Sequence, residues 1–285
     1  MGRLSLFGSS RSRSVEYNIV RGNGWRLLRD KIDEAIHEDG FLFVLIIGER
    51  GKGKSTLALN VLNWIYGGDA GRVKRATIFT IDDYDSIVNK QDNLLSGGDG
   101  RIKALLWDDM GLHFSTYQWF IPHLRQRMTE FIENFQSVRE DIAVLIGTVV
   151  EADMLPPKMR GTANYMVDCV RRGKAKLFGY KRYLWFKTWK VKGELEWTKA
   201  DPNLYSYYKK MKKKAHRAKE KARIASRTKL AKIYADLLKS LSRVDVELLY
   251  GLGIVDKDNE LTPFGEYVLA KAGLVLEDLL VGGVV

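Results

Sequence analysis

The feature that most constrains the fold is the sequence G-E-R-G-K-G-K-S at residues 48–55, which matches the pattern G-x-x-x-x-G-K-[ST]. This pattern carries structural meaning when it joins a buried strand to a helix. Residues 41–47 form a continuous apolar run, typical of a strand buried on both faces, and residues 56–62 continue as an apolar helical segment. The sequence therefore predicts a strand, a glycine-rich turn and a helix in this order.

The same motif predicts how a nucleoside triphosphate is held. Backbone N–H groups of the turn and the N-terminus of the helix surround the phosphates. Lys54 reaches the β- and γ-phosphate oxygens, and the hydroxyl of Ser55 ligates Mg²⁺. The expected cofactor-binding residues are Gly48, Glu49, Arg50, Gly51, Lys52, Gly53, Lys54, Ser55 and Thr56.

Two carboxylates, Asp108 and Asp109, follow an apolar strand pattern at residues 104–107. A strand ending beside the glycine-rich turn would bring Asp108 to Mg²⁺ opposite Ser55. Asp109 points in another direction and is the candidate to orient and deprotonate the attacking water. Asp is shorter than the Glu often found at such a position, so the choice of base between the two acids stays open.

Two further catalytic residues are expected near the γ-phosphate. Thr148 ends the apolar run 142–147, so its hydroxyl would lie near the γ-phosphate and the water; the alternative is a threonine that only packs. Phosphoryl transfer also needs a cation against the charge that develops on the γ-phosphate, often supplied by a neighbouring subunit. Arg160, which precedes the fifth apolar run, is the candidate, and the competing candidates are Arg125, Arg127 and Arg139.

Five apolar segments alternate with helical patterns and predict an α/β fold with a parallel sheet and helices on both faces. These segments are residues 41–47, 76–81, 102–107, 142–147 and 165–170.

Together these residues resemble an ASCE-division P-loop ATPase. The stretch W-D-D-M-G at residues 107–111 is similar to the corresponding strand end of helicase-loader and transposition-helper ATPases of the AAA+ group. The resemblance covers roughly residues 17–172. It implies a P-loop NTPase fold with a parallel five-stranded sheet of order 5-1-4-3-2, and hydrolysis of ATP with Mg²⁺ at the subunit interfaces of a homo-oligomer working on DNA. AAA+ proteins follow strand five with a helical lid, whereas an aromatic segment follows here, so DNA-pumping and RecA-like ATPases remain alternatives.

The net charge of +12 is concentrated in two blocks. Residues 171–192 contain nine Lys and Arg and no acid, and residues 209–232 contain twelve against the single acid Glu220. Such blocks favour a polyanionic partner, and the rings interleaved with the first block suit stacking on bases. The alternatives are rings that pack on the core and a helix that is merely solvated. We expect largely sequence-independent binding of nucleic acid, DNA in the first place, through Lys181, Arg182, Lys187, Lys190, Lys209, Lys210, Lys212, Lys213, Lys214 and Arg217.

The chain is expected to divide into five parts. These are a flexible basic tail (1–16), the ATPase domain (17–172), a basic aromatic β-ribbon extension (173–200), a lysine-rich helix (201–241) and a C-terminal winged-helix-like or oligomerisation module (242–285). No apolar run approaches the roughly 20 residues that span a bilayer, and there is no signal-peptide core. With a single cysteine, Cys169, a cytoplasmic protein without a membrane partner is expected.

The sequence favours a DNA-binding ATPase, a motor or loader that hydrolyses ATP in an oligomer assembled on DNA for replication, transposition or genome handling. The alternative is a nucleotide-gated DNA-binding regulator with little turnover. A small-molecule kinase is a third option, but it leaves the basic C-terminal region unexplained.

Overall fold

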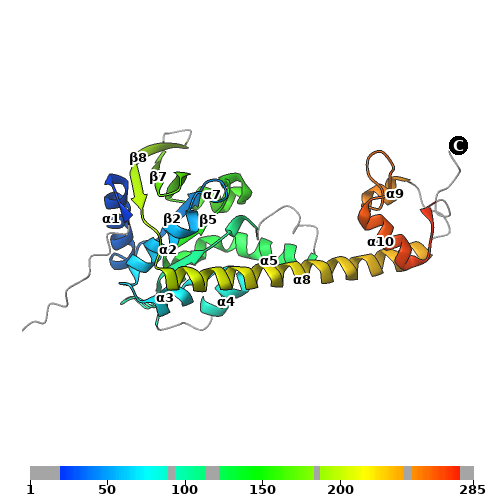
Figure 1. Ribbon diagram of the computed structural model, residues 1–285, viewed down its shortest axis with the longest axis horizontal. Coiled ribbons are helices and arrows are strands. Elements are labelled where there is room, and N and C mark those ends of the chain that lie inside the picture. Colours follow the sequence, from blue (N-terminus) through cyan, green and yellow to red (C-terminus); the bar gives the residue numbers. More distant parts are fainter. Residues whose placement is uncertain (1–19, 89–93, 113–121, 183–186, 241–245, 277–285) are drawn as a thin grey trace, which may run out of the picture. The chain divides into compact units, whose positions relative to one another are not determined.

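The computed structural model describes residues 20–88, 94–112, 122–182, 187–240 and 246–276 (Figure 1). It divides into two compact units, Met1–Lys212 and Lys213–Val285. The boundary falls inside one long helix, α8 (Pro202–Ser240), whose first residues belong to the first unit and whose remainder belongs to the second. The expected basic tail, residues 1–16, lies outside the described residues.

In the described chain the first unit is built on one eight-stranded sheet, in the order β1-β8-β7-β6-β2-β5-β4-β3. The run β6-β2-β5-β4-β3 is paired in parallel, whereas β7, β8 and β1 are added antiparallel at the β6 edge. The strands are β1 (Val20–Arg21), β2 (Leu42–Ile47), β3 (Thr77–Ile78), β4 (Ile102–Trp107), β5 (Ile142–Thr148), β6 (Tyr165–Arg171), β7 (Lys174–Arg182) and β8 (Lys187–Trp197).

The expected fold class, a P-loop NTPase with a parallel five-stranded sheet of order 5-1-4-3-2, is wrong, because the sheet of the described chain has eight strands and mixes parallel with antiparallel pairs. The difference arises at residues 174–197, which the sequence suggests as an extension beyond a complete sheet. Instead, β7 pairs with β6 and β8 pairs with β7, so these strands continue the sheet itself. On β7, buried Ala175 and Leu177 alternate with exposed Lys174 and Lys176, which packs one face of the added strands on the core.

Helices cover the sheet and leave its central strands almost wholly buried; every residue of β5 is buried. In α1, buried side chains recur at helical spacing at Trp25, Leu28, Ile32 and Ala35, which explains how this helix packs on the sheet. The helices of the first unit that precede α8 are α1 (Asn23–His37), α2 (Lys54–Ile65), α3 (Ala70–Arg75), α4 (Ile81–Val88), α5 (Pro122–Glu133), α6 (Val138–Asp141) and α7 (Pro157–Thr162). Short 3₁₀ turns occur at Met110–Leu112, Phe135–Ser137 and Ala152–Met154.

Helix α8 begins where its sequence predicts. Pro202 occupies the first position, and the Asp201 carboxylate accepts a hydrogen bond of 2.9 Å from the backbone N–H of Leu204. Leu204 and Tyr208 in the first turns are buried in the first unit. In the described part of the chain no helix is both long and apolar enough to cross a membrane.

The second unit has a small apolar core of its own. The last turns of α8 contribute Ala231, Ala235 and Leu238, which pack with residues of α9 (Val246–Gly251) and α10 (Pro263–Ala272). An antiparallel bridge joins Val255 to Leu261. Residues 241–245 and 277–285 lie outside the described residues, so the choice between a winged-helix-like and an oligomerisation module stays a prediction.

Candidate nucleotide site

The glycine-rich turn has a backbone that side chains would not tolerate. Gly48 and Gly53 adopt φ values of +134° and +93°, and Gly53 starts helix α2. A Cβ on Gly48 would lie 3.0 Å from the carbonyl oxygen of Cys169 in β6, and one on Gly53 would lie 3.3 Å from the indole of Trp197 at the end of β8. The positive φ values favour glycine at both positions, and a side chain at either would also have to displace a neighbour by a few tenths of an ångström.

Lys54 lies at the first position of α2 and is folded into the turn. Its side chain is buried, and Nζ donates hydrogen bonds to the carbonyl oxygens of Gly48 at 2.5 Å and Glu49 at 3.0 Å. Burial lowers the pKa of Lys54, and the nearby carboxylate of Asp109 opposes that shift. The ammonium is thus held against the loop that is expected to surround phosphates.

Asp108 follows β4 and is completely buried. Its Oδ1 accepts hydrogen bonds from the hydroxyls of Ser55, at 2.7 Å, and Thr148, at 2.9 Å. Thr148 Oγ1 also accepts the backbone N–H of Asp109 at 2.9 Å. The carboxyl ends of β4 and β5 and the start of α2 therefore meet at one carboxylate. The Thr148 hydroxyl, which the sequence predicts near the γ-phosphate, contacts Asp108 and the backbone of Asp109.

Asp109 lies on a left-handed turn, with a φ of +52°. Asp is one of the few residues with a side chain that tolerate this conformation. The turn separates the two acids: Asp108 is buried beneath the loop, whereas the side chain of Asp109 keeps 22% of its surface exposed.

Helix α8 contributes two residues that the sequence analysis does not assign to this site. The Tyr208 hydroxyl donates to Asp108 Oδ2 at 2.6 Å, and Lys212 Nζ lies 2.7 Å from the same oxygen and 2.6 Å from Asp109 Oδ2. Lys212 is expected among the nucleic-acid contacts, but its ammonium is paired with these two carboxylates. The available signal is the apolar spacing of Leu204 and Tyr208, which places Lys212 one turn further along the same face.

The cluster remains ionised despite its burial. Burial alone would raise the pKa of Asp108, but the Lys212 ammonium and hydrogen bonds from Lys212, Ser55 and Tyr208 outweigh it and lower that pKa. Burial opposes the charge of Lys212, yet the attraction of Asp108 raises its pKa. Burial and the Asp108 charge raise the pKa of Tyr208, which therefore keeps its proton and acts as a donor.

The donor set suits Mg²⁺ better than a metal held by protein alone. Among the described residues no group of three or more His, Cys, Asp and Glu side chains could hold a metal. Mg²⁺ typically takes one or two carboxylates, phosphate oxygens and waters. Asp108 and the Ser55 hydroxyl provide such a partial set, Asp109 lies beside them, and the ammonium of Lys212 contacts both acids.

A cavity of about 530 Å³ adjoins the glycine-rich turn. Thr56, the residue after Ser55, lies on one side, and Trp197 and Tyr205 contribute rings. Arg172 and Gly173 lie on the turn that joins β6 to β7 and complete part of the rim. The site thus combines a phosphate-type loop with a neighbouring cavity that has aromatic walls.

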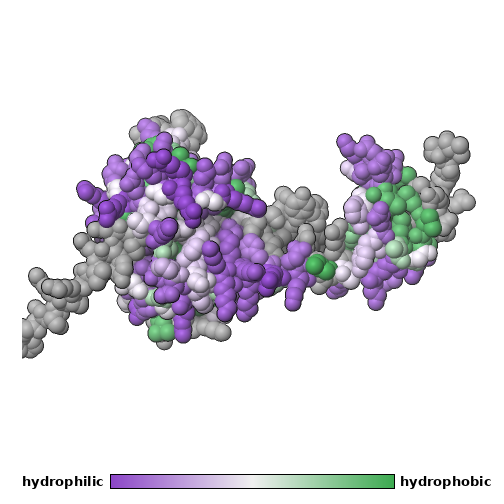
Figure 2. Space-filling model, in the orientation of Figure 1, coloured by the Kyte–Doolittle hydropathy of each residue, from purple (hydrophilic) through white to green (hydrophobic). Residues whose placement is uncertain are grey.

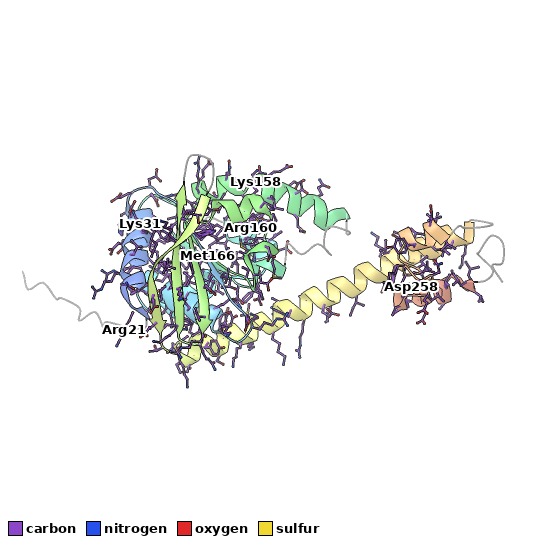
Figure 3. All side chains as sticks on the ribbon, turned by 90° about the horizontal axis from the view of Figure 1, so that it is seen from above. Arg21, Lys31, Lys158, Arg160, Met166 and Asp258 are labelled. Carbon is purple, nitrogen blue, oxygen red and sulfur yellow. The ribbon has the colours of Figure 1, made fainter. Side chains whose placement is uncertain are left out.

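Arg160 does not join these residues within one chain. Arg160 lies in α7, directly before the start of β6. Strand β6 runs parallel to β2, with Tyr165 at its start paired to Val44, so Arg160 lies at the edge of the sheet where these strands begin. The glycine-rich turn follows the other end of β2, and Figure 3 shows Arg160 at the end of the strands opposite the start of α8. Arg139, in the helix directly before β5, lies at that same strand-start edge, and the side chains of Arg125 and Arg127 lie outside the described residues.

The other residues expected to contact nucleic acid divide by position. The side chains of Lys181, Arg182 and Lys187 lie outside the described residues. On β7 and β8, Lys174 pairs with Glu196 at the end of the ribbon, which offsets some of the basic charge. Figure 2 shows a mainly hydrophilic surface over α8. Exposed side chains in this set are Lys190, Lys209, Lys210, Lys213, Lys214 and Arg217.

Comparison with known proteins adds little to the site. No family model matches the chain. An uncharacterized protein of Sulfolobus spindle-shape virus 1, B-251, is 22% identical over 157 residues, which cover 54% of this chain and 61% of the viral protein. The chain therefore spans less than two thirds of that relative, whose name assigns no activity.

Replacing Thr148 by Val should lower the free energy of unfolding of the first unit by about 1–3 kcal/mol, because a buried hydroxyl that serves both acids is lost at nearly constant volume. Thr148→Ser keeps the hydroxyl and is the matched control. Urea unfolding of both variants measures the difference. A Val variant as stable as the wild type would show that the hydroxyl does not support the carboxylate pair.

Proposed function

We propose that this protein binds and hydrolyses ATP with Mg²⁺ while in contact with nucleic acid. The observation that supports this most directly is the 2.7 Å hydrogen bond between the Ser55 hydroxyl and Asp108 Oδ1, which joins the glycine-rich turn to the carboxylate after β4. A serine that only caps a helix would not need a buried carboxylate as its partner. The pair matches what a Mg²⁺-triphosphate requires from a protein.

The residues take separate roles in this reaction. Lys54 would neutralise phosphate charge, and Ser55 and Asp108 would hold the metal. The Thr148 hydroxyl positions the carboxylate of Asp108 and the backbone of Asp109. When bound, Mg²⁺ supplies positive charge to the phosphate oxygens. Asp109 accepts a proton from water as the water oxygen bonds to the γ-phosphorus; the bond from that phosphorus to the β–γ bridging oxygen breaks, and ADP leaves with its electron pair.

The cavity beside Thr56 supports a nucleotide rather than a bare polyphosphate as the ligand. A base placed there would meet the rings of Trp197 and Tyr205, and stacking of a base on an aromatic side chain is worth roughly 1–3 kcal/mol. Trp197 also packs against Gly53, so the same ring would contact the base and support the glycine-rich turn.

Assembly into a homo-oligomer is part of the proposal. The γ-phosphate needs a cation beyond Lys54, and Arg160 lies at the strand-start edge, away from the turn of its own chain. Arg160 therefore suits a role toward the site of a neighbouring subunit.

The exposed cations of α8 support nucleic acid as the partner. Lys209, Lys210, Lys213 and Lys214 are all exposed in the first turns after the nucleotide site. Contacts of this kind are to phosphates, so they carry no base readout and weaken as salt rises. The pairing of Lys212 with both acids also favours a second function, a nucleotide-gated DNA-binding regulator with little turnover.

Lys54→Ala should abolish ATP binding and hydrolysis, whereas Asp109→Asn should bind ATP and lose turnover, because only the proton acceptor is removed. Arg29→Ala, at an exposed cation of α1 that is not assigned to the site, should behave as wild type. Phosphate release and binding of a fluorescent ATP analogue measure the two effects, with and without single- and double-stranded DNA. Hydrolysis by Lys54→Ala would remove the assigned site; turnover below detection with intact binding would favour the regulator.

Tyr205→Ala should weaken ATP binding by about fivefold to tenfold while leaving tripolyphosphate binding unchanged, because only ATP has a base to stack. Tyr207→Ala is the control, since Tyr207 is exposed on the same helix and does not line the cavity. Competition against a fluorescent nucleotide gives both affinities. Equal losses of affinity for ATP and for tripolyphosphate would show that the base does not bind in this cavity.

Replacing Lys209, Lys210, Lys213 and Lys214 together by Gln should weaken DNA binding and reduce the slope of log affinity against log salt by up to about four. The control replaces Lys229, Lys232 and Lys239, exposed lysines nearer the end of α8. Fluorescence anisotropy with labelled DNA at several salt concentrations provides the slopes. An unchanged slope in the first variant would return these lysines to a purely solvating role.

A further inference from the structure

Lys212 holds an unusual position for a residue of a basic helix. Its Nζ contacts one carboxylate oxygen of Asp108 and one of Asp109, together with the Tyr208 hydroxyl at 3.1 Å. Its side chain is 27% exposed, whereas the side chains of its neighbours Lys213 and Lys214 are exposed. One lysine of the cluster is thus committed to the carboxylate pair.

The contacts leave Asp108 no oxygen without a partner. Its Oδ1 accepts from Ser55 and Thr148, and its Oδ2 accepts from Tyr208 and Lys212. A metal at this carboxylate therefore requires at least one partner to give way. Thr148 is fully buried and Ser55 is itself an expected ligand, so the flexible, partly exposed side chain of Lys212 is the partner that can leave.

We propose that Lys212 is the resident counter-ion of Asp108 and Asp109 and that it gives up both carboxylates when Mg²⁺-nucleotide binds. The proposal rests on the proposed function and adds its regulation: Tyr208 and Lys212 tie the start of α8 to the two carboxylates. Two neighbouring carboxylates repel one another unless a cation lies beside them, so the ammonium and the metal serve the same need and compete.

Release of Lys212 has a consequence for α8. Lys212 and Tyr208 make the polar contacts between the first turns of α8 and the nucleotide site. Apolar packing comes from buried Leu204 and from the ring contact between Tyr208 and Phe79. A freed Lys212 joins the exposed Lys209 and Lys213 as a cation available to phosphates. Nucleotide binding would therefore strengthen nucleic-acid binding through the same helix.

The test measures binding of a fluorescent ATP analogue to the full chain across a range of Mg²⁺ concentrations. Lys212→Met removes the competing charge and should lower the Mg²⁺ concentration for half-maximal binding by about tenfold, which corresponds to 1.4 kcal/mol. Lys213→Met removes an adjacent exposed lysine and should match the wild type. Lys212→Arg keeps a cation and should not show the decrease.

The possible outcomes distinguish the counter-ion role of Lys212 from the proposed nucleotide-binding function. An unchanged or higher Mg²⁺ requirement in folded Lys212→Met overturns the counter-ion role while leaving the nucleotide site in place. Failure of the wild type and both control variants to bind nucleotide at any Mg²⁺ concentration removes the proposed function itself. If Lys212→Met does not fold, hydrogen exchange of the wild type decides: amides of residues 208–212 should exchange faster with Mg²⁺-nucleotide, and unchanged or slower exchange overturns the proposal.

Discussion

The buried carboxylate of Asp108 is the constraint on which the rest of the first unit depends. A charge without solvent must be compensated by hydrogen bonds and an opposite charge, and truncating one partner of such a pair is costly. Here the compensation comes from α2, β5 and α8, through Ser55, Thr148, Tyr208 and Lys212. Elements distant in the sequence are thereby fixed around one atom group, and that group is the one a Mg²⁺-nucleotide would need.

The antiparallel strands explain how α8 reaches this point. The parallel strand β6 runs toward the edge where the glycine-rich turn lies, β7 returns to the opposite edge, and β8 runs back again. The chain then arrives beside the turn, where Trp197 packs on Gly53 and α8 begins at Pro202. Strand β8 also brings Trp197 to the wall of the cavity beside Thr56. The strands that overturn the expected sheet are thus the ones that close the site.

Local patterns predict the turn, the strand before it and the helix after it, because each signal is contained within one short segment. The hydrogen bond between Ser55 and Asp108 agrees with the expected meeting of the turn and the strand end, whereas the partners of Thr148 depend on how β4 and β5 pair. The sequence does not place β7 and β8 in the sheet, because aromatic and basic residues suit a free ribbon as well as a strand paired at the sheet edge. Lys212 is predicted together with its neighbours as a nucleic-acid contact, because a run of lysines by itself does not indicate which one faces inward. Its spacing of four residues from Tyr208 is the local signal that separates it from Lys213, and its Nζ contacts Asp108 and Asp109.

The most direct test of the account is calorimetric titration of ATP into the full chain, with Mg²⁺ and again with a chelator. We predict saturable binding of one nucleotide per chain that weakens strongly when Mg²⁺ is removed, because two carboxylates and a serine hydroxyl are gathered beside the turn. Binding that is indifferent to Mg²⁺, or no binding at all, would contradict the assignment of these residues to a metal–nucleotide site.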